Sequence, residues 1–323
     1  MKDKMLLDHE KQIQDCQRAI DQIKAQNKVS EIWEQEEISK LENKLCELKR
    51  QVYAQLTPWQ RVTICRHPDR PHGVDYIKNM CTSFTEIFGD RLFRDDRSMI
   101  TGLGMIGGQK FAIIAQEKGC DTDSRLYRNF GMSHPEGYRK ALRLMKLAAR
   151  FNLPVLSLID TPGAYAGLAA EERGQGWAIA NNLLEMSVLP TPIIVVLIGE
   201  GCSGGALGIG VGDVIGMLEH AYYSVIAPES GAAILWHDST KKAEAAASFK
   251  MQAEDALRFN IIDTIIDEPQ GGAHYDPQVV YRGVKDFVLE QRESLMQIPK
   301  RKLLERRYQK FRCIGAFSQD LAL

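Results

Sequence analysis

One glycine-rich stretch follows a buried-type apolar run and matches two chemical motifs at once. Residues 199–213 read GEGCSGGALGIGVGD, directly after PIIVVLI. The glycines that begin at Gly199 satisfy G-x-G-x-x-G, the pattern of dinucleotide binding. The sequence around Ser203 satisfies G-x-S-x-G, the nucleophile elbow of serine hydrolases. At most one of these two assignments can hold for the same turn.

The surrounding sequence disfavours both motifs. Dinucleotide binding needs an acidic residue about 20 positions further on, after the next strand, but Glu219 precedes the expected strand AYYSVIA. A hydrolase needs an acid and a histidine, and Asp213 is expected too close along the same helix. Three histidines follow the serine, namely His220, His237 and His274, and none has a context typical of a general base. Ser203 also suits a helix N-cap, and a hydrolase using Ser203 stays the alternative hypothesis.

A third interpretation uses the backbone and needs no catalytic side chain. Glycines at a strand-to-helix junction let a ligand approach backbone N–H groups, and the N-terminus of a helix attracts negative charge. The stretch DTPGAYAG, residues 160–167, is a second junction of this kind, one strand and helix earlier. Two such junctions at the carboxyl ends of neighbouring strands are expected to line one crevice. The sequence therefore favours an oxyanion hole made of backbone N–H groups.

Composition excludes several classes of function. The chain of 323 residues has 41 Lys and Arg against 42 Asp and Glu, so no overall charge attracts nucleic acid or a membrane. Its 7 cysteines include no C-x-x-C pair and no cluster with histidine, which predicts free thiols and no metal site. No segment has the length and apolarity of a membrane span or signal peptide. We therefore expect a cytoplasmic protein.

The first part of the chain predicts a helical hairpin. Residues 2–52 contain no proline or glycine, and apolar residues recur at steps of three and four, as at Ile13, Cys16 and Ile20. Two antiparallel helices turning near residues 27–30 would each have one apolar stripe. We expect the stripes to pack on each other or on the chain's own core, although a subunit interface is the alternative. Residues 1–56 form the predicted hairpin domain, and residues 57–323 form the catalytic domain.

The catalytic domain is predicted to alternate strands and helices, which indicates an α/β fold. Residues 57–73 are expected to be a connection with little regular structure. The segment 98–119 predicts a β-hairpin around the turn Gly107-Gly108. Further elements are expected as a helix at 135–150, the strand LPVLSLID, a helix at 171–186, the strand PIIVVLI, a helix from the glycine-rich stretch, the strand AYYSVIA, a helix at 241–259, the strand IIDTIID and a long helix at 283–312. The basic run in the last helix is expected to be a solvated face, with a phosphate anchor or acidic partner as the alternative.

Three longer runs carry a family resemblance. They are RNFGMSHPEGYRKALRLM (128–145), IDTPGAYAGLAAEERGQGWAIANNL (159–183) and IGEGCSGGALGIGVGD (198–213). Together they resemble the α subunits of bacterial acetyl-CoA carboxylase carboxyltransferases over nearly the whole chain. The resemblance implies a crotonase-like fold, a superhelix of ββα units, with the N-terminal helical hairpin and a C-terminal helix added. It also implies transfer of a carboxyl group from carboxybiotin to acetyl-CoA, giving malonyl-CoA for fatty acid synthesis.

The same resemblance implies partners. The family pairs an α subunit of this kind with a zinc-containing β subunit in an α2β2 assembly, and biotin arrives on the biotin carboxyl carrier protein after biotin carboxylase has loaded it. Carboxybiotin and acetyl-CoA would be substrates, with no covalently bound cofactor, no membrane and no nucleic acid. Because the site would be shared between two chains, this chain alone is expected to be inactive.

Site residues follow from matching positions. Gly204 and Gly205 match the glycine pair of the family's oxyanion hole, and the resemblance places four further residues beside the substrates: Gly163, Ala164, Tyr165 and Gly201. Two positions depart from the family pattern, because Cys202 and Ala166 stand where glycine and proline are usual. Cys202 is expected to be a tolerated small residue that nevertheless removes a position able to take positive φ. Ala166 is expected to loosen one turn.

Overall fold

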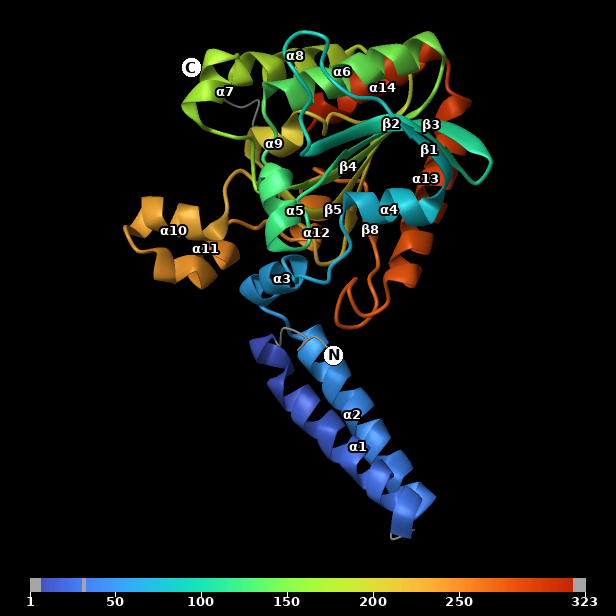
Figure 1. Cartoon of the computed structure of the whole chain (residues 1–323), viewed down its shortest axis with the longest axis vertical. Coiled ribbons are helices and arrows are strands. Elements are labelled where there is room, and N and C mark those ends of the chain that lie inside the picture. The colour runs from blue at the N-terminus through green and yellow to red at the C-terminus, as the bar shows by residue number, and fades with distance from the viewer. Residues whose placement is uncertain (1–6, 31–32, 316–323) are drawn as a thin grey trace, which may run out of the picture.

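A mixed sheet of eight strands lies at the centre of the protein (Figure 1). The computed structural model describes residues 7–30 and 33–315. Within them the strands are β1 (Cys81–Glu86), β2 (Met99–Ile106), β3 (Gln109–Gln116), β4 (Val155–Thr161), β5 (Ile193–Cys202), β6 (Val214–Leu218), β7 (Tyr222–Ser224) and β8 (Thr264–Ile266). The order is β1-β2-β3-β4-β5-β6-β8, and β7 pairs with the end of β5.

The pairing pattern determines where the strands end. β1, β2 and β3 are antiparallel neighbours, joined at β2 and β3 by the predicted turn, in which Gly107 and Gly108 both have positive φ of 55° and 76°. From β3 through β4, β5 and β6 to β8, every pairing is parallel. The carboxyl ends of β3, β4 and β5 therefore meet at one edge of the sheet, where open α/β sheets bind their ligands.

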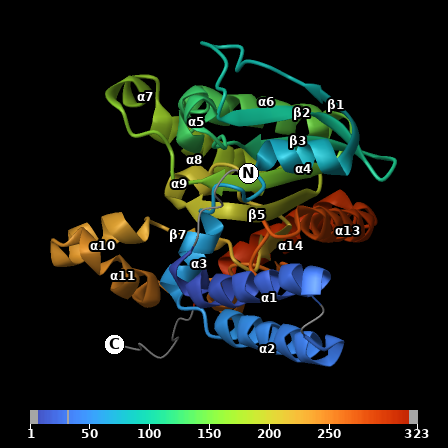
Figure 2. The ribbon, with the colours of Figure 1, turned by 60° about the horizontal axis from the view of Figure 1, so that its bottom comes forward.

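Helices cover both faces of the sheet (Figures 1 and 2). α6 packs on β2 and β3 with α8 beside it, and α4 packs on the other face against β1, β3 and β4. The helices of the described residues are α1 (Lys11–Ser30), α2 (Gln35–Ala54), α3 (Pro58–Cys65), α4 (Gly73–Met80), α5 (Thr122–Tyr127), α6 (Pro135–Arg150), α7 (Leu168–Glu172), α8 (Gln175–Ser187), α9 (Ser203–Leu207), α10 (Pro228–Trp236), α11 (Lys242–Ser248), α12 (Ala253–Arg258), α13 (Pro277–Met296) and α14 (Lys300–Arg312). None of these helices is long and apolar enough to span a bilayer.

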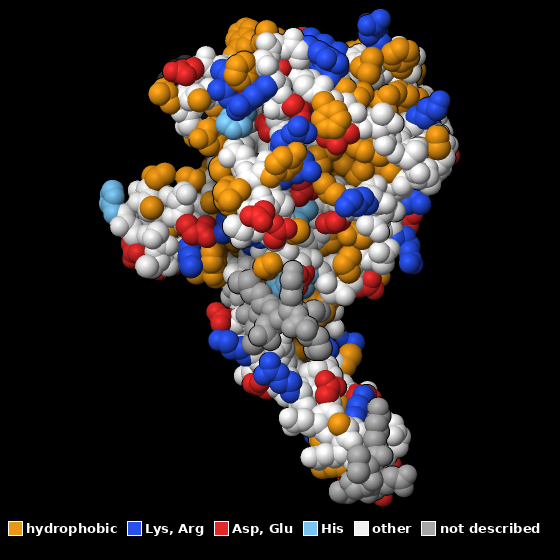
Figure 3. All heavy atoms as spheres, in the orientation of Figure 1, with side chains coloured by type: hydrophobic (Ala, Val, Ile, Leu, Met, Phe, Trp, Pro, Cys, Tyr) orange, Lys and Arg blue, Asp and Glu red, His pale blue; other side chains and the backbone are white. Residues whose placement is uncertain are grey.

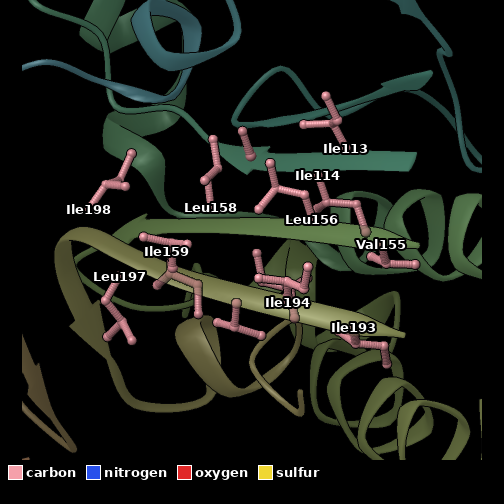
Figure 4. Packing of buried hydrophobic residues seen from close by; sticks show 14 of the residues in the cluster. Ile113, Ile114, Val155, Leu156, Leu158, Ile159, Ile193, Ile194, Leu197 and Ile198 are labelled. Atoms are coloured by element: carbon pink, nitrogen blue, oxygen red, sulfur yellow. The ribbon is translucent and has the colours of Figure 1, made fainter. Parts of the chain in front are cut away.

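The core lies around the central parallel strands (Figure 4). Every residue of β4 and β5 is buried, as the continuous apolar runs in their sequences predict for parallel strands covered on both faces. Leu156 and Ile194 occupy opposite positions on the two strands, and Ile113 precedes them on β3 in register with Leu156. This packing fixes the strand ends that carry the glycine-rich junctions.

The N-terminal helices form the predicted hairpin and project from the body (Figure 1). Ile13 and Ile20 of α1 pack with Leu45 of α2 in one apolar cluster, so the stripes pack on each other as expected. Basic and acidic side chains are scattered over the face of the hairpin that Figure 3 shows. The predicted turn position is wrong, because α1 continues through Ser30 and the Asn27 side chain bonds the backbone of Trp33 at 2.7 and 2.9 Å. The division into domains 1–56 and 57–323 stays a prediction.

Three helices expected to be continuous are each broken. The segment 171–186 is divided between α7 and α8 by Gly174, which has a φ of 79°. The segment 241–259 is divided between α11 and α12 near Lys250, which also has positive φ. The tail 283–312 is divided between α13 and α14 at Pro299, whose ring cannot continue a helix. Gly174 and Pro299 are helix-breaking residues visible in the sequence, and the prediction of continuous helices did not take them into account.

Three further expectations are corrected. The segment 57–73 contains α3, whose N-cap Thr57 and Gln60 form a capping box and whose first residue is Pro58. The basic run of α14 is only partly solvated, since the Arg307 side chain is 1% exposed and makes an ion pair with Asp213. The strand predicted for AYYSVIA is shorter than expected, because only β7, Tyr222–Ser224, is in strand conformation.

Candidate active site at the carboxyl ends of the parallel strands

The two glycine-rich junctions of the sequence touch each other in the fold. Residues 162–167 form a loop after β4, and residues 203–205 form a turn after β5; we name them the β4 loop and the β5 turn. Thr161 pairs with Gly201 at the strand ends. A Cβ atom built on Gly205 would lie 2.5 Å from the carbonyl carbon of Gly163 and 2.6 Å from the nitrogen of Ala164. Only glycine therefore permits this backbone contact.

The β5 turn is the first turn of the short helix α9. Gly204 and Gly205 lie in the first turn of α9, where backbone N–H groups have no acceptor within the helix. Ser203 begins the helix with a φ of 52° and is exposed, so it is not the N-cap that the sequence suggested. Cys202 occupies the N-cap position with a φ of −112°. Its extended backbone does not require glycine, and the expected loss of positive φ there is wrong.

The two glycines of the pair differ in the space around them. A Cβ on Gly204 would meet Cδ1 of Ile179 at 3.4 Å, an ordinary van der Waals contact with the end of a side chain. The carbonyl of Gly205 accepts a hydrogen bond from Nε2 of the buried Gln116 at 2.7 Å, and the Tyr138 hydroxyl lies 3.5 Å away. Gly205 is thus held from both sides, whereas Gly204 has room.

Hydrogen bonds also fix the β4 loop. The Oγ1 of Thr161 accepts from the Gly163 N–H at 3.1 Å, and Gly163 itself has a φ of 145° that side chains rarely adopt. The backbone of Tyr165 is held through its N–H by the Ser133 carbonyl and through its carbonyl by Nε2 of Gln175. Its ring lies 4.4 Å from that of His134. The loop therefore has a single well-supported conformation.

The remaining predicted site residues have different positions. Gly201 is buried inside β5, and a Cβ there would come within 2.5 Å of Leu197. Ala166 is exposed. The buried Cys202 thiol contacts the Tyr222 hydroxyl at 3.6 Å, and burial raises the pKa of this thiol to about 12. The thiol is therefore protonated at neutral pH and is a poor nucleophile, as expected for a tolerated small residue.

A charged cluster beneath the two glycine elements was missed by the sequence analysis. The ammonium of Lys118, just beyond β3, lies 2.7 Å from Oδ1 of Asp160 and 2.9 Å from Oε1 of Glu200. Arg66 and the Tyr222 hydroxyl bind the other Glu200 oxygen at 3.1 and 2.5 Å. We name these five residues the carboxyl-end cluster. Its sequence signal was a charged residue at or just beyond the end of each of three buried strands.

The charges of this cluster stabilise one another. Burial would lower the pKa of the Lys118 ammonium, but the adjacent carboxylates outweigh burial and raise it. Burial likewise would raise the pKa of Asp160 and Glu200, but the Lys118 charge, with His72 beside Asp160 and Arg66 beside Glu200, holds both below their usual range. All three groups are therefore ionised at neutral pH, and none is set to exchange a proton.

Two cavities lie beside the glycine elements. One of about 380 Å³ borders Ser203 and Gly204 and is otherwise mainly apolar. The other, of about 250 Å³, borders Pro162 of the β4 loop together with Lys118 and Glu200. In the described ranges, no group of three or more His, Cys, Asp or Glu side chains is arranged so that it could hold a metal ion. The arrangement offers backbone donors between an apolar and a charged wall.

The residues that a serine hydrolase would need lie apart from the β5 turn. Asp213 follows the end of α9 and makes an ion pair with Arg307, so it does not share a helix with Ser203. The backbone N–H of His220 donates to the buried Glu268. His237 ends α10, and the His274 ring stacks on the ring of His67 at 3.8 Å. No described contact assembles these groups into a catalytic triad with Ser203.

The chain is similar to known proteins over nearly its whole length. The family described as acetyl co-enzyme A carboxylase carboxyltransferase-like matches residues 6–315. The chain belongs to this family. It is 59% identical to the acetyl-coenzyme A carboxylase carboxyl transferase subunit alpha of Protochlamydia amoebophila, over 97% of this chain and 98% of that protein. The subunit of the same name from Chlamydia caviae is 57% identical over 97% and 96%. Family membership confirms the predicted function, that of a carboxyltransferase α subunit.

Solved structures show the fold of the family. The chain superposes on transcarboxylase 12S with a TM-score of 0.54 at 19% identity, over 68% of this chain and 41% of that chain. The β subunit of Pseudomonas aeruginosa geranyl-CoA carboxylase gives a TM-score of 0.55 at 13% identity, over 78% and 45%. A Pseudomonas malonate decarboxylase gives 0.53 at 15%, over 65% and 84%. These likenesses confirm the predicted crotonase-like α/β fold.

Proposed function

We propose that the β4 loop and the β5 turn stabilise oxyanions during transfer of a carboxyl group from carboxybiotin to acetyl-CoA. The carrying observation is the backbone contact of Gly205 with Gly163 and Ala164. This contact brings the first turn of α9 against a second glycine-containing loop at the carboxyl edge of the sheet. Preorganised N–H donors at such a place act on negative charge that develops in the reaction.

The chemistry of the transfer needs such donors more than it needs an acid or a base. Release of the carboxyl group from carboxybiotin leaves negative charge on the ureido group, and removal of a proton from the acetyl methyl gives an enolate oxygen. Biotin nitrogen can accept that proton, so the protein's task is to orient both substrates and to hold the oxyanion. The ionised, mutually paired groups of the carboxyl-end cluster agree with this division of roles.

The proposal includes partners that complete the site. A zinc-containing β subunit would hold most of CoA in an α2β2 assembly, and carboxybiotin would arrive on the biotin carboxyl carrier protein, loaded by biotin carboxylase. Relatives carry the word subunit in their names, which supports a multichain enzyme. We expect the assembly in the cytoplasm, with no covalently attached cofactor on this chain.

The test is decarboxylation of malonyl-CoA with free biotin as acceptor, measured for this chain with and without its β subunit. Activity should require both chains. In the reconstituted enzyme G205A should lower kcat about 10²- to 10³-fold, the usual effect of a lost oxyanion donor, because its Cβ would push the two glycine elements apart. G283A is the control and should stay within about threefold of the wild-type kcat, since Gly283 lies in α13, outside both glycine elements, and its Cβ would meet only a methyl group of Ile266 at 3.6 Å.

Equal activity in the two glycine variants would remove the oxyanion assignment, and full turnover by the isolated chain would remove the shared site. S203A separates the hydrolase alternative. Loss of the Ser203 hydroxyl should leave carboxyl transfer within about threefold, because the side chain is exposed and bonds no described group. A folded S203A enzyme without any activity would instead favour the serine hydrolase.

A further inference from the structure

We infer that Lys118 is a positioning residue of the carboxyl-transfer site, which sets the separation of the β4 loop and the β5 turn by bridging Asp160 and Glu200. The inference rests on the proposed oxyanion role of the two glycine elements. It concerns a residue that none of the sequence motifs includes and that lies beyond the end of a third strand, β3.

The two carboxylates lie near the carboxyl ends of neighbouring strands, close to where the two glycine elements begin. Asp160 is the penultimate residue of β4, two positions before the β4 loop begins. Glu200 lies near the carboxyl end of β5, three positions before the β5 turn. The Lys118 ammonium contacts one oxygen of each, at 2.7 and 2.9 Å. One cation thus joins the strand ends from which both glycine elements continue.

The Asp160 end of the bridge packs closely against the backbone of β5. Oδ1 of Asp160 also accepts the backbone N–H of Glu200 at 2.9 Å, and a Cβ on Gly199 would lie only 2.3 Å from that same oxygen. The Asp160 and Glu200 side chains are 3% and 8% exposed. Because Oδ1 of Asp160 packs directly against the backbone at Gly199 and Glu200, a shift of this carboxylate must move the backbone near the end of β5.

Asp160 and Glu200 need the Lys118 ammonium between them. Two ionised carboxylates at this distance from one ammonium repel each other strongly when the ammonium is removed, since the interior screens charge poorly. Arg66 binds only the Glu200 side of the pair, and His72 binds only the Asp160 side, at 3.1 and 3.2 Å. Of the described residues, Lys118 is the cation that contacts both carboxylates.

Lys118→Met tests the inference in the reconstituted enzyme, with Lys310→Met as the control. Lys310 is matched in burial, since its side chain is 14% exposed against 13% for Lys118, and it also pairs with a carboxylate, Asp263. It lies near the amino ends of β6 and β8, away from the glycine elements. K118M should lower kcat about 10²-fold, the scale expected when reacting groups are misplaced by about 1 Å. The KM for malonyl-CoA should stay within about threefold.

Conservative rescue separates positioning from general damage. K118R should recover most of kcat, because a guanidinium can bridge two carboxylates and the cavity of about 250 Å³ beside Lys118 leaves room for it. K310M should change stability but not kcat. A K118M enzyme with wild-type kcat, or with KM raised and kcat unchanged, would overturn the inference. So would a kcat loss equal to that of K310M.

A second variant covers the case in which K118M does not fold. In K118M/E200Q the buried repulsion is relieved, yet no cation joins the two strand ends. Its kcat should remain at least about tenfold below wild type, and a return to wild-type kcat would overturn the positioning role. The glycine variants keep the two proposals apart: a harmless G205A would remove the oxyanion proposal, whereas a harmful G205A with a harmless K118M would remove only this inference.

Discussion

The two edges of the parallel sheet both carry buried ion pairs, but the pairs hold different kinds of structure. At the carboxyl edge, Lys118 joins two carboxylates on neighbouring strands, and glycine-rich elements continue from both. At the amino edge, Arg307 of α14 makes an ion pair with Asp213, which precedes β6. We name Arg307, Asp213, Lys310 and Asp263 the amino-end cluster. The same interaction type serves positioning at one edge and attachment of a helix at the other.

Hydrogen bonding explains the difference. The Arg307 guanidinium donates to the backbone carbonyls of Met186, Leu189 and Thr191 in addition to Asp213, so it satisfies the end of α8 and the connection into β5. All of these acceptors belong to segments that lead into the sheet. At the carboxyl edge the first-turn N–H groups of α9 have no acceptor within the helix, and we propose that they bind the oxyanion of a substrate. The ion pair at the amino edge therefore attaches α14 to the sheet. In our proposal, the ion pairs at the carboxyl edge instead set the separation of the β4 loop and the β5 turn.

The largest expected effect on stability comes from the amino-end cluster. R307M would leave Asp213 buried without its cation and would remove donors from three carbonyls, so the free energy of unfolding should fall by about 3–5 kcal/mol. R307K should lie between the variant and wild type, since an ammonium lacks the fork that binds Asp213 at two oxygens. Urea unfolding measures the change. The kcat per folded enzyme should be unchanged, and a selective loss of kcat with normal stability would break the comparison.

Sequence reasoning found the β4 loop and the β5 turn because glycine reports directly on local geometry. Gly205 packs its Cα on another backbone, and Gly107 has positive φ; both demands act at the residue itself. The helix 135–150 was likewise predicted with its observed bounds, because Pro135 starts it and its apolar face is regular. Local causes can be read without knowing which strands are neighbours.

The charged cluster could not be assigned with the same ease, because its partners come from separate strands. Lys118, Asp160 and Glu200 each read as an isolated charge after an apolar run. Their contact depends on β3, β4 and β5 being adjacent and parallel. The helix breaks are a different case, because Gly174 is visible in the sequence as a residue that can end a helix, but only the structure shows that it takes positive φ there.

His220 also lies at the carboxyl edge of the sheet, after β6, but we expect it to contribute to stability and not to catalysis. Burial lowers the pKa of His220 to about 4, although the neighbouring Glu268 opposes the shift, and Glu268 itself is bound by Arg70 at 2.6 Å. The unfolded chain takes up a proton on this residue near its ordinary pKa of about 6.5, so the stability contributed by neutral His220 is lost as pH falls from about 6.5 to 4.

The expected size is moderate. Between pH 7 and pH 5 wild type should lose about 2 kcal/mol more stability than H220Q, in which the titrating group is absent. Urea unfolding of both proteins at the two pH values gives the difference, and other groups cancel because they are common to both. Parallel pH dependence in the two proteins would mean that His220 is not held neutral. The kcat at pH 7 should be similar, since His220 lies after β6 and away from the glycine elements.

The smallest effect tests whether Gly205 needs support from its carbonyl as well as its Cα. Gln116 is fully buried, and its Nε2 donates to the Gly205 carbonyl at 2.7 Å, while its Oε1 has no hydrogen-bond partner among the described residues. Q116M keeps the volume and removes this donor, so kcat should fall about tenfold and stability by about 1 kcal/mol. Q252M is the matched control, because Gln252 is also buried, donates to the Pro58 carbonyl at 3.4 Å and, within the described part of the chain, has no partner for its Oε1. It should lose similar stability and keep its kcat. If both variants lost kcat alike, the effect would reflect general loosening of the core; a loss confined to Q116M would show that the carboxyl edge of the sheet holds Gly205 at a fixed position for catalysis.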